Sequence, residues 1–357
     1  MSTRADRLVE LLAGAAADAI LVTNPVNVRY LTGFTGSSAI ALIGPDIRVF
    51  ATDFRYVEQA AKELDASFDR VGPSQDRLEA IADALPAGDT RLGFEEAHLS
   101  VREHARLRER LPDRIELDGL HGLVENLRAI KAPEEVAAIR AAAELADEAF
   151  ARIISHGLVG HRERELAIAL EFEMRRLGAD RPSFEPIVAT GPHGALPHAR
   201  PRDVEITSGE LVVIDWGAQL GGYCSDCTRT LAAGSVNGHG AEIHQLVLDA
   251  QIKGVQAIAA GAAGREVDAV ARHVIDSRGH GERFGHGLGH GVGLEVHEDP
   301  RLAQRSDAVL EPGNVVTVEP GVYLPGELGV RIEDLVVVTG SGREILSGLA
   351  KELTVID

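Results

Sequence analysis

Residues 1–120 alternate between short apolar runs and amphipathic stretches. Apolar runs bounded by Gly, Pro or Asp indicate strands, whereas apolar residues spaced three or four apart indicate helices. The segments 38–44 and 47–53 flank a Gly-Pro-Asp turn and predict a hairpin. The other predicted elements are a helix around Leu8, Leu11 and Leu12, a strand at 19–23, and helices at 54–64 and 101–111. Together they predict a small α/β domain.

The rest of the chain repeats one order of elements. Pro133, followed by Glu134 and Glu135, is typical of a helix start, because proline and acidic side chains both favour the first turn. The predicted elements are helices at 133–156 and 162–177, strands bearing Asp215 and Asp226, helices at 238–260 and 265–279, and strands bearing Glu319 and Glu333. We therefore expect two similar halves whose sheets curve together. The predicted domains are 1–125 and 126–357.

Four of these side chains are carboxylates in apolar, strand-like runs, where a charge is costly unless it is paired, protonated or bound to a cation. Asp215 and Asp226 flank Gly221–Gly222, which fits a hairpin that returns both acids to the same end. Glu319 and Glu333 flank a Pro-Gly step and a short loop, so the same geometry follows. We expect the two halves to deliver all four acids to a shared centre.

His290, in the run His286-Gly-Leu-Gly-His290, adds an imidazole to these oxygen ligands. Carboxylates suit hard divalent ions, and one imidazole extends the range to Mn, Co, Fe or Zn. One ion does not need four carboxylates and a histidine, whereas two ions that share carboxylates do, and such pairs activate water. The alternative is a set of unrelated buried ion pairs, for which Arg229 and Arg331 are the nearby cations.

Two other metal motifs compete with this interpretation. His286 and His290 have the i, i+4 spacing of zinc proteases, but HGLGH lacks the glutamate, and its glycines disfavour a helix. Cys224 and Cys227 have CxxC spacing, but a structural zinc site would need a second such pair. Residues three apart in a strand face opposite sides, so we expect two small buried thiols without a disulfide.

Charge and length exclude some classes of partner. The formal net charge of −19 argues against nucleic acid or an anionic membrane. No run is long and apolar enough to span a bilayer, and MSTRADRLVELLAG at the N-terminus lacks the apolar core of a secretory signal. We expect a cytoplasmic protein.

The acids, the histidine and their flanks resemble the pita-bread metallopeptidases (M24), which include methionine aminopeptidase, aminopeptidase P, prolidase and creatinase. The motifs similar to the proline-specific branch are IDWGAQLGGYCSDCTRT, GHGLGHGVGLEVHEDP, VVTVEPGVY, GVRIEDLVVV, NVRYLTGFTGSSA and TDFRYVEQA. The resemblance covers essentially the whole chain. It implies a creatinase-like α/β N-terminal domain followed by an α+β pita-bread catalytic domain.

The resemblance also implies roles for individual side chains. Two metal ions would have five ligands: Asp215 at one ion, Asp226 and Glu333 at both, and His290 and Glu319 at the other. Glu319 would also carry a proton to the leaving nitrogen, and His297 would stabilise the tetrahedral intermediate. The pocket would be lined by His198, His286, His297 and Arg331, with His198 also counted as catalytic and Tyr223 as a neighbour.

The implied activity is a dinuclear Xaa-Pro peptidase, in which a hydroxide shared by the metals attacks the bond before proline at the N-terminus of short peptides. Manganese is the expected metal, with cobalt or zinc as alternatives, because availability decides which ion fills such a site. The sequence leaves dipeptidase and aminopeptidase open. The expected partners are short peptides with proline in second position and a second copy of the chain in a homodimer. The alternative is a non-catalytic peptide- or protein-binding module with the same fold.

Overall fold

The structure is a computed structural model that describes residues 3–74 and 76–357. The chain divides into two compact units, Met1–Arg128 and Ala129–Asp357. Each unit has its own sheets and its own buried apolar clusters. In the part of the chain that the structure describes, no helix has both the length and the apolar character required to cross a membrane.

A six-stranded sheet forms the centre of the N-terminal unit, in the order β4-β3-β2-β1-β5-β6. Its strands are β1 (Ala19–Val22), β2 (Ala39–Gly44), β3 (Ile47–Thr52), β4 (Asp69–Arg70), β5 (Thr90–Glu95) and β6 (Ile115–Leu120). β2 and β3 form the predicted antiparallel hairpin, and β5 pairs in parallel with both β1 and β6. The predicted α/β class of this unit is therefore confirmed.

Helices pack on this sheet: α1 (Arg4–Gly14), α2 (Pro25–Thr32), α3 (Val57–Glu63), α4 (Arg77–Ala82), α5 (Val101–Arg110) and α6 (Leu123–Ala129). Capping boxes at Thr3 and Ser100 fix the starts of α1 and α5, because each hydroxyl accepts a backbone N–H of the first turn. α1 buries Leu8 and Leu12 but leaves Leu11 38% exposed, so one of its three predicted core leucines faces outward.

The helix predicted at 54–64 is divided in two. It begins with a 3-10 turn over Phe54–Tyr56 and continues as α3. Asp53 precedes the turn, and its carboxylate accepts the backbone N–H of Arg55 at 3.0 Å. The Asp53 cap fixes the first turn of the helix, and 3-10 geometry is common in the first turn.

The C-terminal unit contains the predicted repeated order of elements. Its helices are α7 (Pro133–Ile154), α8 (Glu163–Arg176), α9 (Gly238–Ala257) and α10 (Gly264–Asp276). One four-stranded sheet has the order β20 (Val355–Ile356), β12 (Cys227–Ala233), β9 (Leu211–Trp216) and β8 (Ile187–Thr190). A five-stranded sheet has the order β14 (Glu298–Leu302), β13 (Gly289–Gly291), β15 (Val315–Val318), β18 (Asp334–Thr339) and β19 (Gly342–Ile345).

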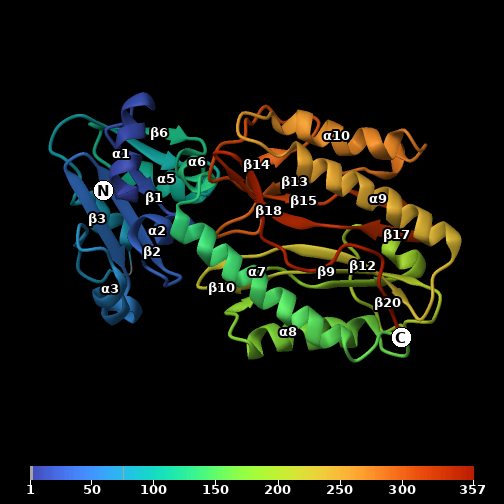
Figure 1. The fold of residues 1–357 in the computed structure, drawn as a ribbon. Helices are drawn as coiled ribbons and strands as arrows, with labels where there is room; N and C mark the ends of the chain where they lie inside the picture. The colour runs from blue at the N-terminus through green and yellow to red at the C-terminus, as the bar shows by residue number, and fades with distance from the viewer. Residues whose placement is uncertain (1–2, 75) are drawn as a thin grey trace. The chain divides into compact units, whose positions relative to one another are not determined.

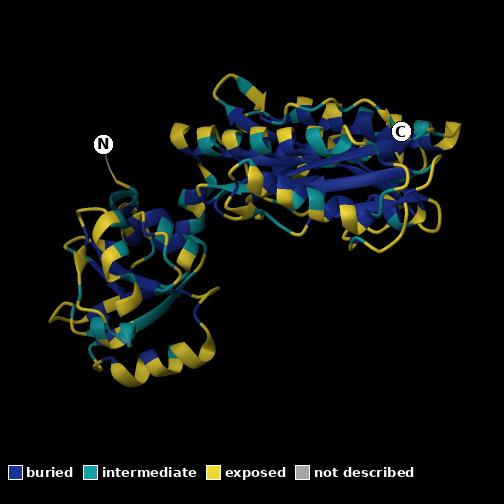
Figure 2. Ribbon diagram, turned by 90° about the horizontal axis from the view of Figure 1, so that it is seen from below, coloured by how far each residue is buried: buried dark blue, intermediate teal, exposed yellow. Residues whose placement is uncertain are grey.

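The helices of this unit enclose the sheets. Figure 1 shows α7 and α8 on one side of the strands and α9 and α10 on the other. One apolar cluster joins α7 and α8 to β9 and β12, and includes the stacked rings of Phe150 and Trp216 at 3.9 Å. A second cluster joins α9 and α10 to β15 and β18. The strands between the helices are buried throughout much of their length (Figure 2). The expected division of this unit into two halves, each with two helices followed by a pair of strands, is confirmed.

Each half also contains a hairpin whose ladder is interrupted. In the first half β9 pairs with β12. Between them in the chain, β10 (Ala218–Leu220) pairs with β11 (Tyr223–Cys224) at the tip of the hairpin. The chain turns at Gly221 and Gly222, whose φ angles are 56° and 86°, a region that favours glycine. In the second half β15 pairs with β18, and β16 (Gly321–Leu324) pairs with β17 (Leu328–Arg331) at the tip.

Three of the four predicted acids lie at these interruptions rather than inside strands. Asp215 is within β9, but Asp226 lies between β11 and β12, Glu319 directly follows β15, and Glu333 directly precedes β18. The prediction of four strand-borne acids was therefore wrong in detail. A residue in a regular strand has its direction set by the pleat, whereas a break in the ladder lets the backbone redirect a side chain.

The two halves are joined next to these acids. The backbone N–H of Glu333 donates to Thr228 O at 3.1 Å, and the backbone N–H of Arg331 donates to Thr230 Oγ1 at 3.1 Å. β12 of the first half thus contacts the start of β18 and the end of β17 in the second half. This junction brings acids that are far apart in the sequence to one place.

Candidate metal centre

A cavity of about 580 Å³ opens at the junction of the two halves of the C-terminal unit. The five predicted metal ligands and the predicted pocket residues other than Tyr223 line it: Asp215, Asp226, His290, Glu319, Glu333, His198, His286, His297 and Arg331. They come from separate strands and loops, so the cavity is a product of the fold rather than of one motif.

The core of this cluster is a buried group of Asp226, His290 and Glu333. One ligand atom of each lies within 4.8 Å of the others, a spacing at which they can share an ion. His290 Nε2 is 3.7 Å from Asp226 Oδ2 and 3.3 Å from Glu319 Oε1. Four acids and one imidazole therefore face a common space.

The ring of His290 is oriented for ligation. Its Nδ1 lies 3.1 Å from Gly291 O, so the proton belongs on Nδ1 and the Nε2 lone pair points toward the acids. The backbone N–H of His290 donates to Thr317 Oγ1 at 3.0 Å, and that hydroxyl donates to Glu319 Oε1 at 3.1 Å. His290 lies in β13, not in a helix, so the zinc-protease alternative is excluded.

Arg331 organises the opposite wall of the cavity. Its NH2 donates to Asp215 Oδ2 at 2.6 Å, and its Nε donates to Thr228 Oγ1 at 3.0 Å. The Thr228 hydroxyl in turn donates to Glu333 Oε2 at 2.7 Å. Arg331 NH1 reaches Tyr323 OH at 2.9 Å. One guanidinium thus fixes two of the acids, one of them through the threonine.

The electrostatics of this cluster call for a cation. Burial, together with repulsion from neighbouring acids, raises the pKa of Asp226 and of Glu333 well above the usual range. Burial also raises the pKa of Asp215, although Arg331 opposes it. Burial acts in the same direction on Glu319, but a proton on His290 Nε2, which a bound ion would replace, would outweigh it and lower the pKa of Glu319 to about 2.

The donor set fits divalent metal ions. Asp215 Oδ1 is buried and has no hydrogen-bond partner among the residues that the structure describes, and such orphaned oxygens are rare unless something else occupies them. Carboxylate oxygens with one imidazole nitrogen are ligands for Mn, Co, Fe or Zn. The same ions would offset the repulsion between these acids, because their charge is the largest available in a buried site.

Three histidines line the cavity beyond this cluster. His286 Nε2 lies 2.9 Å from Tyr323 OH, which connects it to Arg331. The ring of His297 lies 4.4 Å from that of His290, and burial, with the neighbouring His290, lowers the pKa of His297 to about 4. His198 is exposed at the cavity wall on the loop after β8.

Two family models match the chain. Metallopeptidase family M24 matches residues 137–340, and Creatinase/Prolidase N-terminal domain matches residues 4–130. The chain belongs to metallopeptidase family M24. The predicted family and the two-part fold class, creatinase-like and pita-bread, are thereby confirmed.

Full-length relatives agree with this assignment of the M24 peptidase. It is 44% identical over 352 residues to the uncharacterized peptidase YqhT of Bacillus subtilis, which covers 98% of this chain and 99% of the relative. Its fold is similar to a solved Xaa-Pro dipeptidase from Bacillus anthracis, with a TM-score of 0.95, 43% identity and 99% of each chain covered. An X-Pro aminopeptidase from Thermotoga maritima has a TM-score of 0.90 and 36% identity, again over 99% of each chain.

Sequence reasoning selected the wrong tyrosine for the pocket of this M24 peptidase. The hydroxyl of Tyr223 donates to Glu135 Oε1 on α7 at 2.8 Å, so Tyr223 does not face the acids. The tyrosine next to the cavity is Tyr323 of β16, which contacts His286 and Arg331. The register of the hairpin formed by β16 and β17 identifies Tyr323, because Gly321, two residues before it, pairs with Arg331.

Thr228 was also missed. It lies two residues after Asp226, and its hydroxyl contacts both Glu333 and Arg331. Thr228 pairs with Asp215 in the register of β9 and β12, so the pairing of these two strands places it at the site. The nearby cysteines are buried free thiols: Cys224 Sγ lies 3.8 Å from Leu294 O and Cys227 Sγ lies 3.5 Å from Glu333 O.

Proposed function

We propose that this M24 peptidase hydrolyses the bond before proline at the N-terminus of short peptides, using two divalent metal ions. The observation that carries the proposal is the convergence of three buried carboxylates, the half-buried Glu319 and one imidazole on a single cavity, with Asp215 Oδ1 left without a partner among the described residues. The names of similar proteins, an Xaa-Pro dipeptidase and an X-Pro aminopeptidase, support proline as the second residue of the substrate.

The proposed ligand set divides between two ions. Asp215 would bind one ion, His290 and Glu319 the other, and Asp226 and Glu333 both. A pair of divalent ions supplies Lewis acidity toward the scissile carbonyl and lowers the pKa of a nearby water. We expect manganese, with cobalt or zinc as alternatives.

The chain's own groups would handle orientation and proton transfer. Glu319, fixed by Thr317 and His290, would hold a proton at its carboxylate and pass it to the proline nitrogen as that nitrogen leaves. His297 would donate an N–H to the scissile carbonyl oxygen as charge develops there. His198 and His286 would bind the peptide, and Arg331 would keep Asp215 and Thr228 in place.

The accepted peptide length depends on the rim of the cavity. Arg200 and Arg301 line the cavity, are exposed, and have no ion pair within the described residues. Either guanidinium could bind the carboxylate that ends an Xaa-Pro dipeptide, because arginine matches carboxylate geometry. This supports activity on dipeptides, and longer peptides would require the same region to stay open.

The deciding experiment is hydrolysis of Ala-Pro and Ala-Pro-Ala by the purified, Mn²⁺-loaded protein, with product separation by chromatography. Release of alanine from either peptide supports the proposal, and cleavage of the dipeptide alone makes the protein a dipeptidase. Ala-Ala is the matched control and should stay intact. If both proline peptides bind but neither is cleaved, the protein is a peptide-binding module instead. The homodimer and the cytoplasmic location stay predictions, which light scattering and cell fractionation test.

A further inference from the structure

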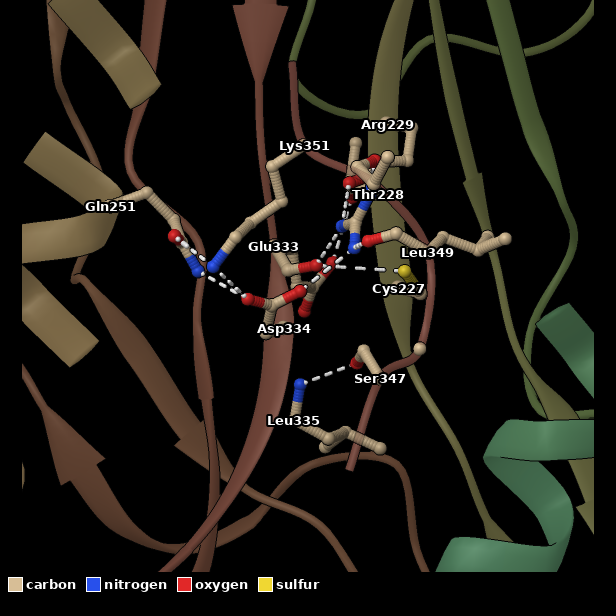
Figure 3. Close-up of polar contacts among 12 residues, drawn as sticks. Cys227, Thr228, Arg229, Gln251, Glu333, Asp334, Leu335, Ser347, Leu349 and Lys351 are labelled. Carbon is tan, nitrogen blue, oxygen red and sulfur yellow. Dashed lines mark hydrogen bonds and ion pairs between the residues drawn. The ribbon is translucent and has the colours of Figure 1, made fainter. Parts of the chain in front are cut away.

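A buried polar network surrounds the backbone of Glu333, one of the proposed ligands (Figure 3). Arg229 of β12 and Asp334 of β18 are joined by NH2 and Oδ1 at 2.8 Å, with side chains 3% and 1% exposed. Asp334 directly follows Glu333, and Arg229 lies on the strand that begins just after Asp226. The pair therefore connects the two chain segments that carry the acids assigned to both ions.

The guanidinium of Arg229 has an acceptor for each of its five N–H groups: Ala350 O at 2.9 Å, Thr228 O at 3.0 Å, Leu349 O at 2.8 Å, Asp334 Oδ1 at 2.8 Å, and Glu333 O. Arginine carries five donors in a rigid planar fork, whereas lysine has three on a flexible stem. A lysine at this position cannot satisfy the same acceptors.

These contacts hold Glu333 on three sides. Its backbone N–H donates to Thr228 O at 3.1 Å, and its backbone carbonyl accepts from Arg229 NH1. Its carboxylate Oε2 accepts from Thr228 Oγ1 at 2.7 Å. Arg229 and Thr228 are neighbours on β12, which begins directly after Asp226. Their contacts therefore fix the position of Glu333 relative to the segment that carries Asp226.

The second oxygen of Asp334 is occupied by different partners. Oδ2 accepts from Gln251 Nε2 and from Lys351 Nζ, both at 2.8 Å. Figure 3 shows Gln251 and Lys351 approaching Asp334 from the side opposite Arg229. Lys351 therefore contacts the same carboxylate as Arg229 but not the backbone of Glu333, which makes it a matched control.

We propose that Arg229 and Asp334 are positioning residues that set the separation of Asp226 and Glu333, and thereby decide whether the centre holds two ions or one. The inference rests on the proposed function, since it takes both acids as shared ligands. A carboxylate that serves two ions must lie within reach of both, so a small shift of the Glu333 backbone affects the second ion most. Loss of partners that orient metal ligands costs about 10–100-fold in affinity.

The test is calorimetric titration of metal-free protein with Mn²⁺, comparing the wild type with Arg229→Lys and Lys351→Met. We expect two ions in the wild type and in Lys351→Met, and a second ion weakened by about 10–100-fold in Arg229→Lys. Electron paramagnetic resonance of frozen samples gives an independent readout. Spin-coupled manganese pairs are expected in the wild type and Lys351→Met, and isolated manganese in Arg229→Lys.

The inference is overturned if Arg229→Lys binds both ions with wild-type affinity, or if Lys351→Met loses the second ion to the same extent. If Arg229→Lys does not fold, Asp334→Asn takes its place in the same titration and is held to the same outcome. A wild type that binds two ions but cleaves no proline peptide would contradict the proposed function alone, because the titration still decides the role of Arg229.

Discussion

Arg331 donates to one oxygen of Asp215 at 2.6 Å and leaves the other oxygen buried, with no hydrogen-bond partner in the described part of the chain. The two oxygens of this carboxylate therefore differ: Oδ2 fixes the orientation of the side chain, and Oδ1 is the atom that the proposed function assigns to a metal ion. Arg331 also contacts Thr228 and Tyr323, so it links the acids to the pocket wall. Its replacement would affect metal binding and substrate binding together.

Arg331→Lys is expected to lower kcat/KM for Ala-Pro by at least about 100-fold. Lysine keeps the positive charge but lacks the planar fork that contacts Asp215, Thr228 and Tyr323 together. Hydrogen bonds to charged groups contribute about 1.5–3 kcal/mol each, and about 1.4 kcal/mol corresponds to a tenfold change. The measurement is steady-state hydrolysis with Mn²⁺ in excess. Arg175→Lys, in an exposed helical pair with Glu171, is the control and should keep wild-type kinetics. A variant at position 331 with activity within threefold of the wild type would contradict the assigned role.

Asp226→Asn is expected to remove most hydrolysis, by about 100-fold or more, because an amide is a poor ligand for two ions where a carboxylate can bind both. Bound manganese per chain, measured by elemental analysis after gel filtration, should fall from about two to about one. Asp249→Asn on α9, at a half-buried residue outside the cavity lining, should leave both values unchanged. Full metal content combined with wild-type turnover in Asp226→Asn would show that Asp226 is not a shared ligand.

The sequence predicted much of the fold because its signals are local. Pro133 and the glutamates after it mark the start of α7, and the hairpin turn at Gly221 and Gly222 follows from two residues that tolerate positive φ. The acids were recognisable because a carboxylate in an apolar run is costly wherever the run is buried. The family resemblance then gave each acid an expected role.

Contacts made across the fold were not predictable from local pattern. Tyr323 and Thr228 are ordinary strand residues in sequence, and only the register that pairs Gly321 with Arg331 and the junction of β12 with β18 places them at the site. Asp334 was not predicted to have a role either, because the functional interpretation was given to its neighbour Glu333. Side-chain networks of this kind depend on which strands meet, and a single sequence does not record that directly.

The buried imidazole of His244 on α9 makes acid stability testable. Burial lowers the pKa of His244 to about 4, and its Nε2 has no hydrogen-bond partner within residues 3–74 and 76–357. Because the unfolded value is about 6.5, the folded state binds fewer protons, and stability is lost as pH falls from about 6.5 toward 4. At pH 5 this amounts to about 2 kcal/mol. His244→Leu should remove that component.

The measurement is urea unfolding at pH 7.5 and pH 5.0 with a chelator present throughout. The difference between the two free energies should be about 2 kcal/mol smaller in His244→Leu than in the wild type, whatever the absolute stability of the variant. His239→Leu, an exposed histidine on the same helix, should leave the difference unchanged. An equal pH difference in wild type and His244→Leu would rule out this source of acid sensitivity.

Peptide length can be decided at the two exposed arginines. If Arg301 or Arg200 binds the terminal carboxylate, the wild type should prefer Ala-Pro over its amide, Ala-Pro-NH2, by about tenfold in KM, as expected for one charge-assisted hydrogen bond at a partly exposed site. Substitution of the responsible arginine by glutamine should raise KM for the acid about tenfold and leave KM for the amide and both kcat values unchanged. The other arginine then serves as the matched control, because it shares exposure and charge. If neither substitution changes the ratio of the KM values for the acid and the amide, neither arginine binds the terminal carboxylate. That result would favour the aminopeptidase form of the proposal, with an open cavity, over the dipeptidase.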